Sequence, residues 1–90
     1  MNSTSCLQLA FRDAPPGETA ICAALEAAQR VLERSGASPQ RAFEAYQAFV
    51  TGVGSPDALA LAFARAEAEA MDALAAHGYV HYGTVSLAVL

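Results

Sequence analysis

Two histidines near the end of the chain are the first residues to consider for chemistry. His77 and His81 are four positions apart, which is the spacing of metal ligands on one face of a helix. Gly78 follows His77, and a helix is expected to end there, so the two imidazole rings are not expected to share a face. No acidic residue follows them. We therefore expect no metal site and no other cofactor.

Aromatic residues with polar tips suggest a second candidate, a pocket for a small molecule. Such sites have mostly apolar and aromatic walls with a few polar groups that orient the ligand. The same side chains could instead form one face of a sheet packed on helices, and the sequence leaves both interpretations open. The four residues of this candidate pocket are Tyr46, Tyr79, His81 and Tyr82.

The sequence contains none of the motifs that position a nucleophile or a phosphate. There is no G-x-S-x-G segment, and the glycines of Gly52-Val53-Gly54 are too few for a phosphate-binding loop. Acid–base catalysis needs a carboxylate held in a cleft. Glu67 is the one acid placed beside both apolar stripes of its helix, so it should be mutated first, although a solvated helix flank is the default interpretation of this residue. We predict no catalytic residue.

The composition limits the class of partner. The chain has 90 residues with five basic and nine acidic side chains, a net charge of −4, and 54% apolar residues. This length predicts a single domain spanning residues 1–90. The basic residues are scattered arginines, whereas nucleic-acid binding needs clustered cations. The apolar runs are far shorter than the ~20 residues that span a bilayer. We expect a cytoplasmic protein with no nucleic-acid or membrane partner.

One short segment has a counterpart in a known class of proteins. Residues 71–80, MDALAAHGYV, resemble the end of the recognition helix and the first wing strand of winged-helix DNA-binding proteins. The resemblance implies that the helix before His77 would contact DNA. That helix carries Glu67, Glu69 and Asp72 near this segment, against a single arginine. Acidic side chains repel the phosphate backbone, so we assign the chain to no family.

The pattern of elements is a strand, three helices and a second strand. Residues 6–12 alternate apolar and polar, as a half-buried strand does. Helices are expected over 16–34, from Ser38-Pro39 to about 50, and from Ser55-Pro56 to 76, because serine caps a helix and proline suits its first turn. Residues 79–90 are rich in β-branched and aromatic residues. The fold class is therefore α+β, in the order β-α-α-α-β, with the strands paired and helices on one face.

The helix expected over 56–76 carries two apolar stripes on nearly opposite sides. A surface helix needs only one such stripe, to face its own core. The second stripe therefore meets either another helix of the same chain or a second copy of the protein. The first stripe contains Leu59, Phe63, Ala66, Ala70, Ala73, Leu74 and His77. The second has the alternating spacing of a coiled-coil seam and contains Leu61, Ala64, Ala68, Met71 and Ala75.

The favoured interpretation is a non-catalytic protein-interaction module that forms a homodimer. A chain this short buries only about 60% of its unfolded surface, and a two-stranded sheet leaves two open edges. A twofold dimer is the commonest way to cover such surfaces. The alternatives are a small-molecule binder or simple enzyme using the aromatic pocket, and an acidic inhibitor or antitoxin-like protein that covers another protein. The predicted interface contains Leu61, Ala64, Glu67, Ala68, Met71 and Ala75.

The two thiols are expected to be small buried side chains. Cys6 and Cys22 are the only cysteines, and they have no zinc-ligand spacing. In a reducing compartment such cysteines usually behave as small apolar residues of the core, and a disulfide or a redox pair is the alternative.

Overall fold

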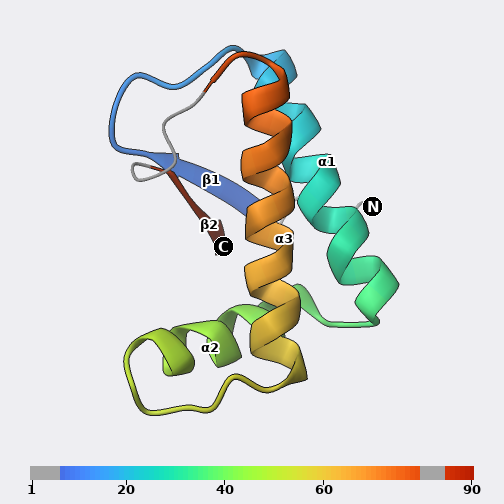
Figure 1. The fold of residues 1–90 in the computed structure, drawn as a ribbon, viewed down its shortest axis with the longest axis vertical. Helices are drawn as coiled ribbons and strands as arrows, with labels where there is room; N and C mark the ends of the chain where they lie inside the picture. The colour runs from blue at the N-terminus through green and yellow to red at the C-terminus, as the bar shows by residue number, and fades with distance from the viewer. Residues whose placement is uncertain (1–6, 80–84) are drawn as a thin grey trace.

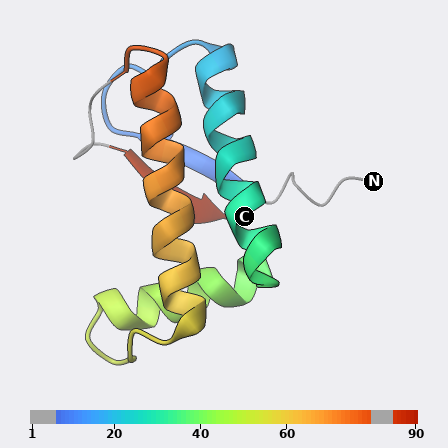
Figure 2. The same cartoon turned by 45° about the vertical axis from the view of Figure 1, so that its right-hand side comes forward.

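The fold confirms the predicted order of elements and the α+β class. The computed structural model describes residues 7–79 and 85–90. In these ranges α1 and α3 run side by side, α2 crosses near one end of α3, and the strands lie beside the helices (Figures 1 and 2). The elements are β1 (Leu7–Phe11), α1 (Glu18–Ser35), α2 (Pro39–Val50), α3 (Ala58–Ala76) and β2 (Val85–Val89).

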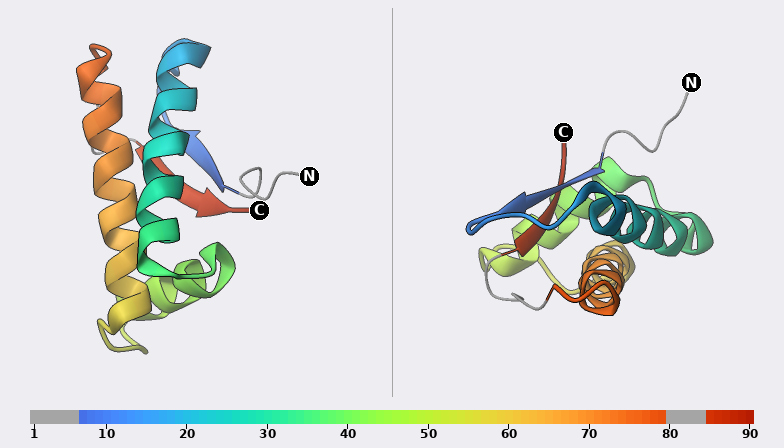
Figure 3. Two further views of the ribbon diagram at one scale, coloured as in Figure 1. Left: turned by 90° about the vertical axis from the view of Figure 1, so that its right-hand side faces the viewer. Right: turned by 90° about the horizontal axis from the view of Figure 1, so that it is seen from above.

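The two strands form an antiparallel sheet, a direction that the sequence left open. Leu9 lies opposite Leu87 and Phe11 opposite Val85. Apolar residues of both strands face the helices, while Gln8 is exposed on the other side. The helices therefore cover one face of the sheet, as predicted, and the other face is open (Figure 3).

Local capping signals explain where α2 and α3 begin. The Ser38 hydroxyl accepts a hydrogen bond from the Arg41 amide at 3.5 Å, and Pro39 is the first helical residue, as predicted. The predicted start of α3 at Ser55-Pro56 is wrong by two residues. Asp57 caps this helix, because its carboxylate accepts from the Ala60 amide at 2.9 Å and its negative charge suits a helix N-terminus.

The end of α3 agrees with the sequence prediction. The helix ends at Ala76, and Gly78 follows with a φ of 87°, in the left-handed region that glycine adopts at low cost. The Tyr79 amide then donates to the carbonyl of Leu74 at 2.9 Å. This turn satisfies a carbonyl that the helix end would otherwise leave unpaired.

The core lies where α3 meets both other helices. Phe63 and Leu74 of α3 and Leu32 of α1 are its largest fully buried side chains. Between α1 and α3 the buried contacts are made largely by alanines, including Ala28 and Ala66, both 0% exposed. Small side chains let two helices approach toward ~8 Å between their axes. The alanine-rich composition is therefore used to bring α1 and α3 close together.

The prediction of buried thiols is wrong for Cys22, which is exposed on α1. It lies two residues from both Ala20 and Ala24, which face the core, so helical geometry turns it to the other side. Cys6 lies outside the described residues. Within the described ranges, none of the helices has the length and hydropathy needed to cross a bilayer.

Candidate functional site

Glu67 joins three elements of the fold. It is half-buried on α3, and its Oε2 accepts a hydrogen bond from the Leu87 amide of β2 at 3.0 Å. Its Oε1 accepts from the Tyr46 hydroxyl of α2 at 3.2 Å. Because the Leu87 amide donates to α3, it points away from β1, so Glu67 closes part of the outer edge of β2. An open strand edge is a common site of unwanted pairing, and this carboxylate blocks it here.

The surroundings of Tyr46 favour the protonated form of its hydroxyl, which donates to Glu67. Burial is the main cause that raises the pKa of Tyr46 above its usual 10.0, and the negative charge of Glu67 and the hydrogen bond to it add to the effect. The ring of Tyr46 also lies 5.2 Å from that of Phe63. Both oxygens of Glu67 accept hydrogen bonds from within the chain, and these bonds hold the carboxylate in place. The arrangement suits a structural role.

Stability is expected to fall as the pH rises above about 10. The unfolded chain loses the Tyr46 proton near the ordinary pKa, whereas the folded chain keeps it to higher pH, so folding weakens between the two values. Tyr46→Phe should make the decline shallower, as measured by urea unfolding at pH ~8 and ~11. Tyr79→Phe controls for the loss of a tyrosine. An unchanged pH dependence in Tyr46→Phe would contradict the expectation.

The residues of the predicted aromatic pocket have separate surroundings where they are described. The Tyr79 hydroxyl donates to the Ala14 carbonyl at 3.0 Å, and its ring meets that of Phe11 edge-on at 5.7 Å. Tyr46 instead contacts Glu67 and Phe63. His81 and Tyr82 lie outside the described residues. The aromatic pocket therefore stays a prediction.

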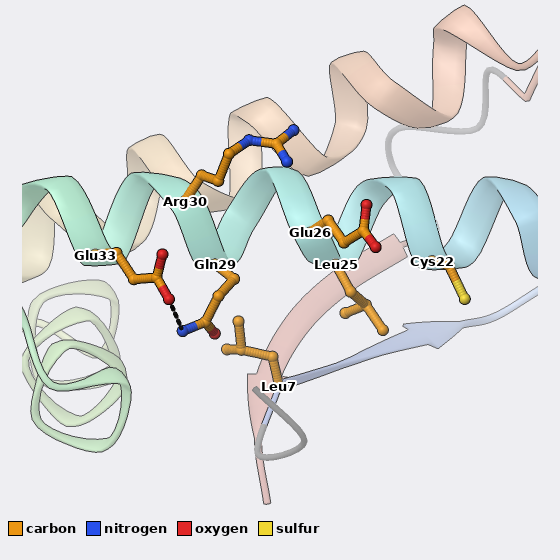
Figure 4. Close-up of a pocket in the computed structure, with 7 residues that line it drawn as sticks. All are labelled: Leu7, Cys22, Leu25, Glu26, Gln29, Arg30 and Glu33. Carbon is orange, nitrogen blue, oxygen red and sulfur yellow. Dashed lines mark hydrogen bonds between the residues drawn. The ribbon is translucent and has the colours of Figure 1, made fainter. Parts of the chain in front are cut away.

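A groove of about 600 Å³ lies beside α1, and no sequence pattern predicts it. In Figure 4, Leu7 of β1 and Leu25 of α1 point into the space between the two elements. Gln29 donates to Glu33 at 3.1 Å, and its own Oε1 is buried without a partner among the described residues. No group of acidic, histidine or cysteine side chains in the described ranges could hold a metal ion. The lining is Leu7, Cys22, Leu25, Glu26, Gln29, Arg30 and Glu33.

The second apolar stripe of α3, here called the outer stripe, is only partly covered by the described chain. Both α1 and α2 pack on α3 (Figure 1), and Met71 of the stripe also packs against the core. Leu61 is 52% exposed, Ala68 is exposed, and the other members are half-buried. The outer stripe is Leu61, Ala64, Ala68, Met71 and Ala75.

The first stripe of α3 faces the core as predicted, apart from one end. Phe63, Ala66, Ala70 and Leu74 are buried, but His77 is exposed because it is the C-cap residue, beyond the last turn. Glu67, predicted at the interface, directs its carboxylate to Tyr46 and Leu87.

Similarity to known proteins does not add to this description. Compared with protein-family models, curated proteins and solved structures, the chain matches none of them. The outer stripe is therefore assessed by its own exposure, spacing and neighbouring charges. These three properties make it the candidate functional surface of the molecule.

Proposed function

We propose that the chain is a non-catalytic protein-interaction module that acts as a homodimer through the outer stripe of α3. The observation that carries this proposal is the exposed apolar surface of the stripe, which begins at Leu61, 52% exposed. Scattered exposed apolar residues are ordinary, but these five repeat every three or four positions along one helix. That repeat suits a second helix lying alongside the first.

The small size of the side chains supports a helix as the occupant. Ala64, Ala68 and Ala75 give a shallow surface that another helix can approach closely. A second copy brings the same stripe to a twofold contact, so both surfaces are covered at once. From Leu61 to Ala75 the stripe extends about 21 Å along the helix. A single helix pair of this length makes a small interface, so we expect dissociation in the micromolar range.

The sheet edges are less suited to joining two copies. On β2, Glu67 already accepts the outward amide of Leu87. On β1, Leu7 is 4% exposed and lies beside α1 across the groove of Figure 4. Strand pairing through β2 would require Glu67 to release the Leu87 amide, whereas helix pairing through α3 would not. The proposal therefore favours the helix face.

Two glutamates placed in the outer stripe should separate the copies. The double variant Ala64→Glu, Ala68→Glu puts four carboxylates into the proposed contact, where they would be desolvated and would repel one another. We expect the wild type to form dimers at micromolar concentration and the variant to remain monomeric. Sedimentation velocity measures the mass, and circular dichroism checks that the helix content is unchanged.

A matched variant separates the effect of the stripe from the effect of added charge. Ala58 and Ala76 are exposed residues at the two ends of α3 and lie outside the outer stripe. Ala58→Glu, Ala76→Glu adds the same two charges to the same helix and should still dimerise. A wild type that sediments as a 9.3 kDa monomer up to high micromolar concentration would overturn the proposal.

A further inference from the structure

Two opposite charges lie beside the outer stripe and have no ion-pair partner in the part of the chain that the structure describes. Arg65 directly follows Ala64 and Asp72 directly follows Met71, and both side chains are exposed. Neither forms an ion pair with any residue in the described ranges. They are seven residues apart, or about 10.5 Å along the helix axis, too far to pair with each other. In a heptad, the outer stripe places Ala64 and Met71 at d and its other three members at a. Arg65 and Asp72 each follow a d residue, so both occupy e positions at the border of the seam.

We propose that the two α3 helices of the dimer run antiparallel, with Arg65 of each copy paired to the partner's Asp72. This inference rests on the proposed function, because it specifies how the outer stripes meet. In an antiparallel seam, a positions face d positions and the flanking e positions face each other. Ala68 then packs against the partner's Met71, so a small residue receives a large one. The twofold axis repeats the ion pair on the other side.

The other arrangements of the same stripes oppose like charges or leave Arg65 and Asp72 without an opposite charge. If the antiparallel helices shift by one heptad, Arg65 faces the partner's Arg65. If the helices run parallel, g positions face e positions, so Arg65 lies near the partner's Ala60. Asp72 then lies near the partner's Glu67, whose carboxylate already accepts from Tyr46 and Leu87, and neither charge gains an opposite partner. Like charges at a helix interface oppose association. The sign and position of these side chains therefore select one direction and one register.

Charge reversal on each side tests this geometry. Arg65→Asp alone gives two acidic side chains at each contact, and Asp72→Arg alone gives two basic ones. We expect each variant to dimerise about tenfold more weakly than the wild type at ~50 mM salt, because two attractions become two repulsions. Mixing the two variants should restore association, because the new aspartate faces the new arginine while the remaining Asp72 faces the remaining Arg65.

Two control variants make the same changes in net charge at positions away from the seam. Glu69→Arg lies on α3 outside the outer stripe, and Arg41→Asp lies on α2, and both positions are exposed. Both should keep the wild-type dissociation constant. Sedimentation of each variant, alone and mixed, gives the constants, and circular dichroism confirms that each variant is folded.

The possible results separate the two proposals. Weak association of each variant alone, with recovery on mixing, supports the antiparallel pair. Stronger association of Asp72→Arg alone would overturn it in favour of a parallel pair, with the dimer itself retained. Wild-type association of both variants, or no recovery on mixing, would overturn the ion pair and leave the dimer standing. A monomeric wild type would overturn the proposed function and this inference together.

Discussion

Replacing Phe63 by alanine is expected to lower the free energy of unfolding by about 3–5 kcal/mol. Phe63 is 0% exposed, and its ring lies 5.3 Å from that of Phe43 and 5.2 Å from that of Tyr46. Alanine would leave a cavity where α2 packs on α3, and these neighbours could fill it only in part. Domains of this size have a total stability of about 5–15 kcal/mol, so much of it should be lost.

A second phenylalanine provides the comparison for this variant. Phe49 lies at the end of α2 and is 42% exposed, so Phe49→Ala removes far less buried surface. We expect it to cost roughly 1 kcal/mol or less. Urea unfolding followed by circular dichroism measures both variants. If Phe63→Ala were no more destabilising than Phe49→Ala, the packing of α2 on α3 described here would be wrong.

Glu67→Ala is expected to have the second largest effect, a loss of about 2 kcal/mol. The substitution removes the acceptor for both the Leu87 amide and the Tyr46 hydroxyl. It also leaves the outer edge of β2 open at Leu87. Amide hydrogen exchange at Leu87 should therefore become faster, because this amide loses its only described acceptor.

Two variants of acidic residues test whether these contacts cause the loss. Glu67→Gln keeps an acceptor oxygen on a side chain of the same length but loses the charge. We therefore expect it to lower the free energy of unfolding by about half as much as Glu67→Ala does. Glu69→Ala removes an exposed carboxylate from the same helix and should change stability by less than about 0.5 kcal/mol. Equal effects of Glu67→Ala and Glu69→Ala would argue against the role assigned to Glu67.

The starts and ends of the helices could mostly be predicted because their causes are local. Pro39 at the start of α2 and Gly78 after α3 act on the backbone within a turn of their own positions. The start of α3 was placed wrongly because Ser55 and Asp57 both suit a cap. Choosing between two nearby caps depends on how the preceding loop reaches the helix, which the sequence does not specify.

The contacts of Glu67 could be predicted only in part. Its place between two apolar stripes indicated either a solvated helix flank, the favoured interpretation, or partial burial at an interface, and the side chain is half-buried within its own chain. Its partners come from residues 46 and 87, about twenty positions away on either side. They depend on the crossing of α2 over α3 and on the strand register, which arise from tertiary packing. The groove beside α1 has the same kind of origin, so it also had no sequence signal.

The pairing of β1 with β2 sets an order of events for folding during synthesis. Leu7 lies opposite Val89, so all three helices leave the ribosome before β1 meets the strand that completes its sheet. The contacts among α1, α2 and α3 span shorter stretches of chain and can form earlier, since closing a shorter loop costs less entropy. Until then the apolar side of β1 has only helices to cover it. The strand β2, translated after the three helices, is thus the one that completes the sheet with β1.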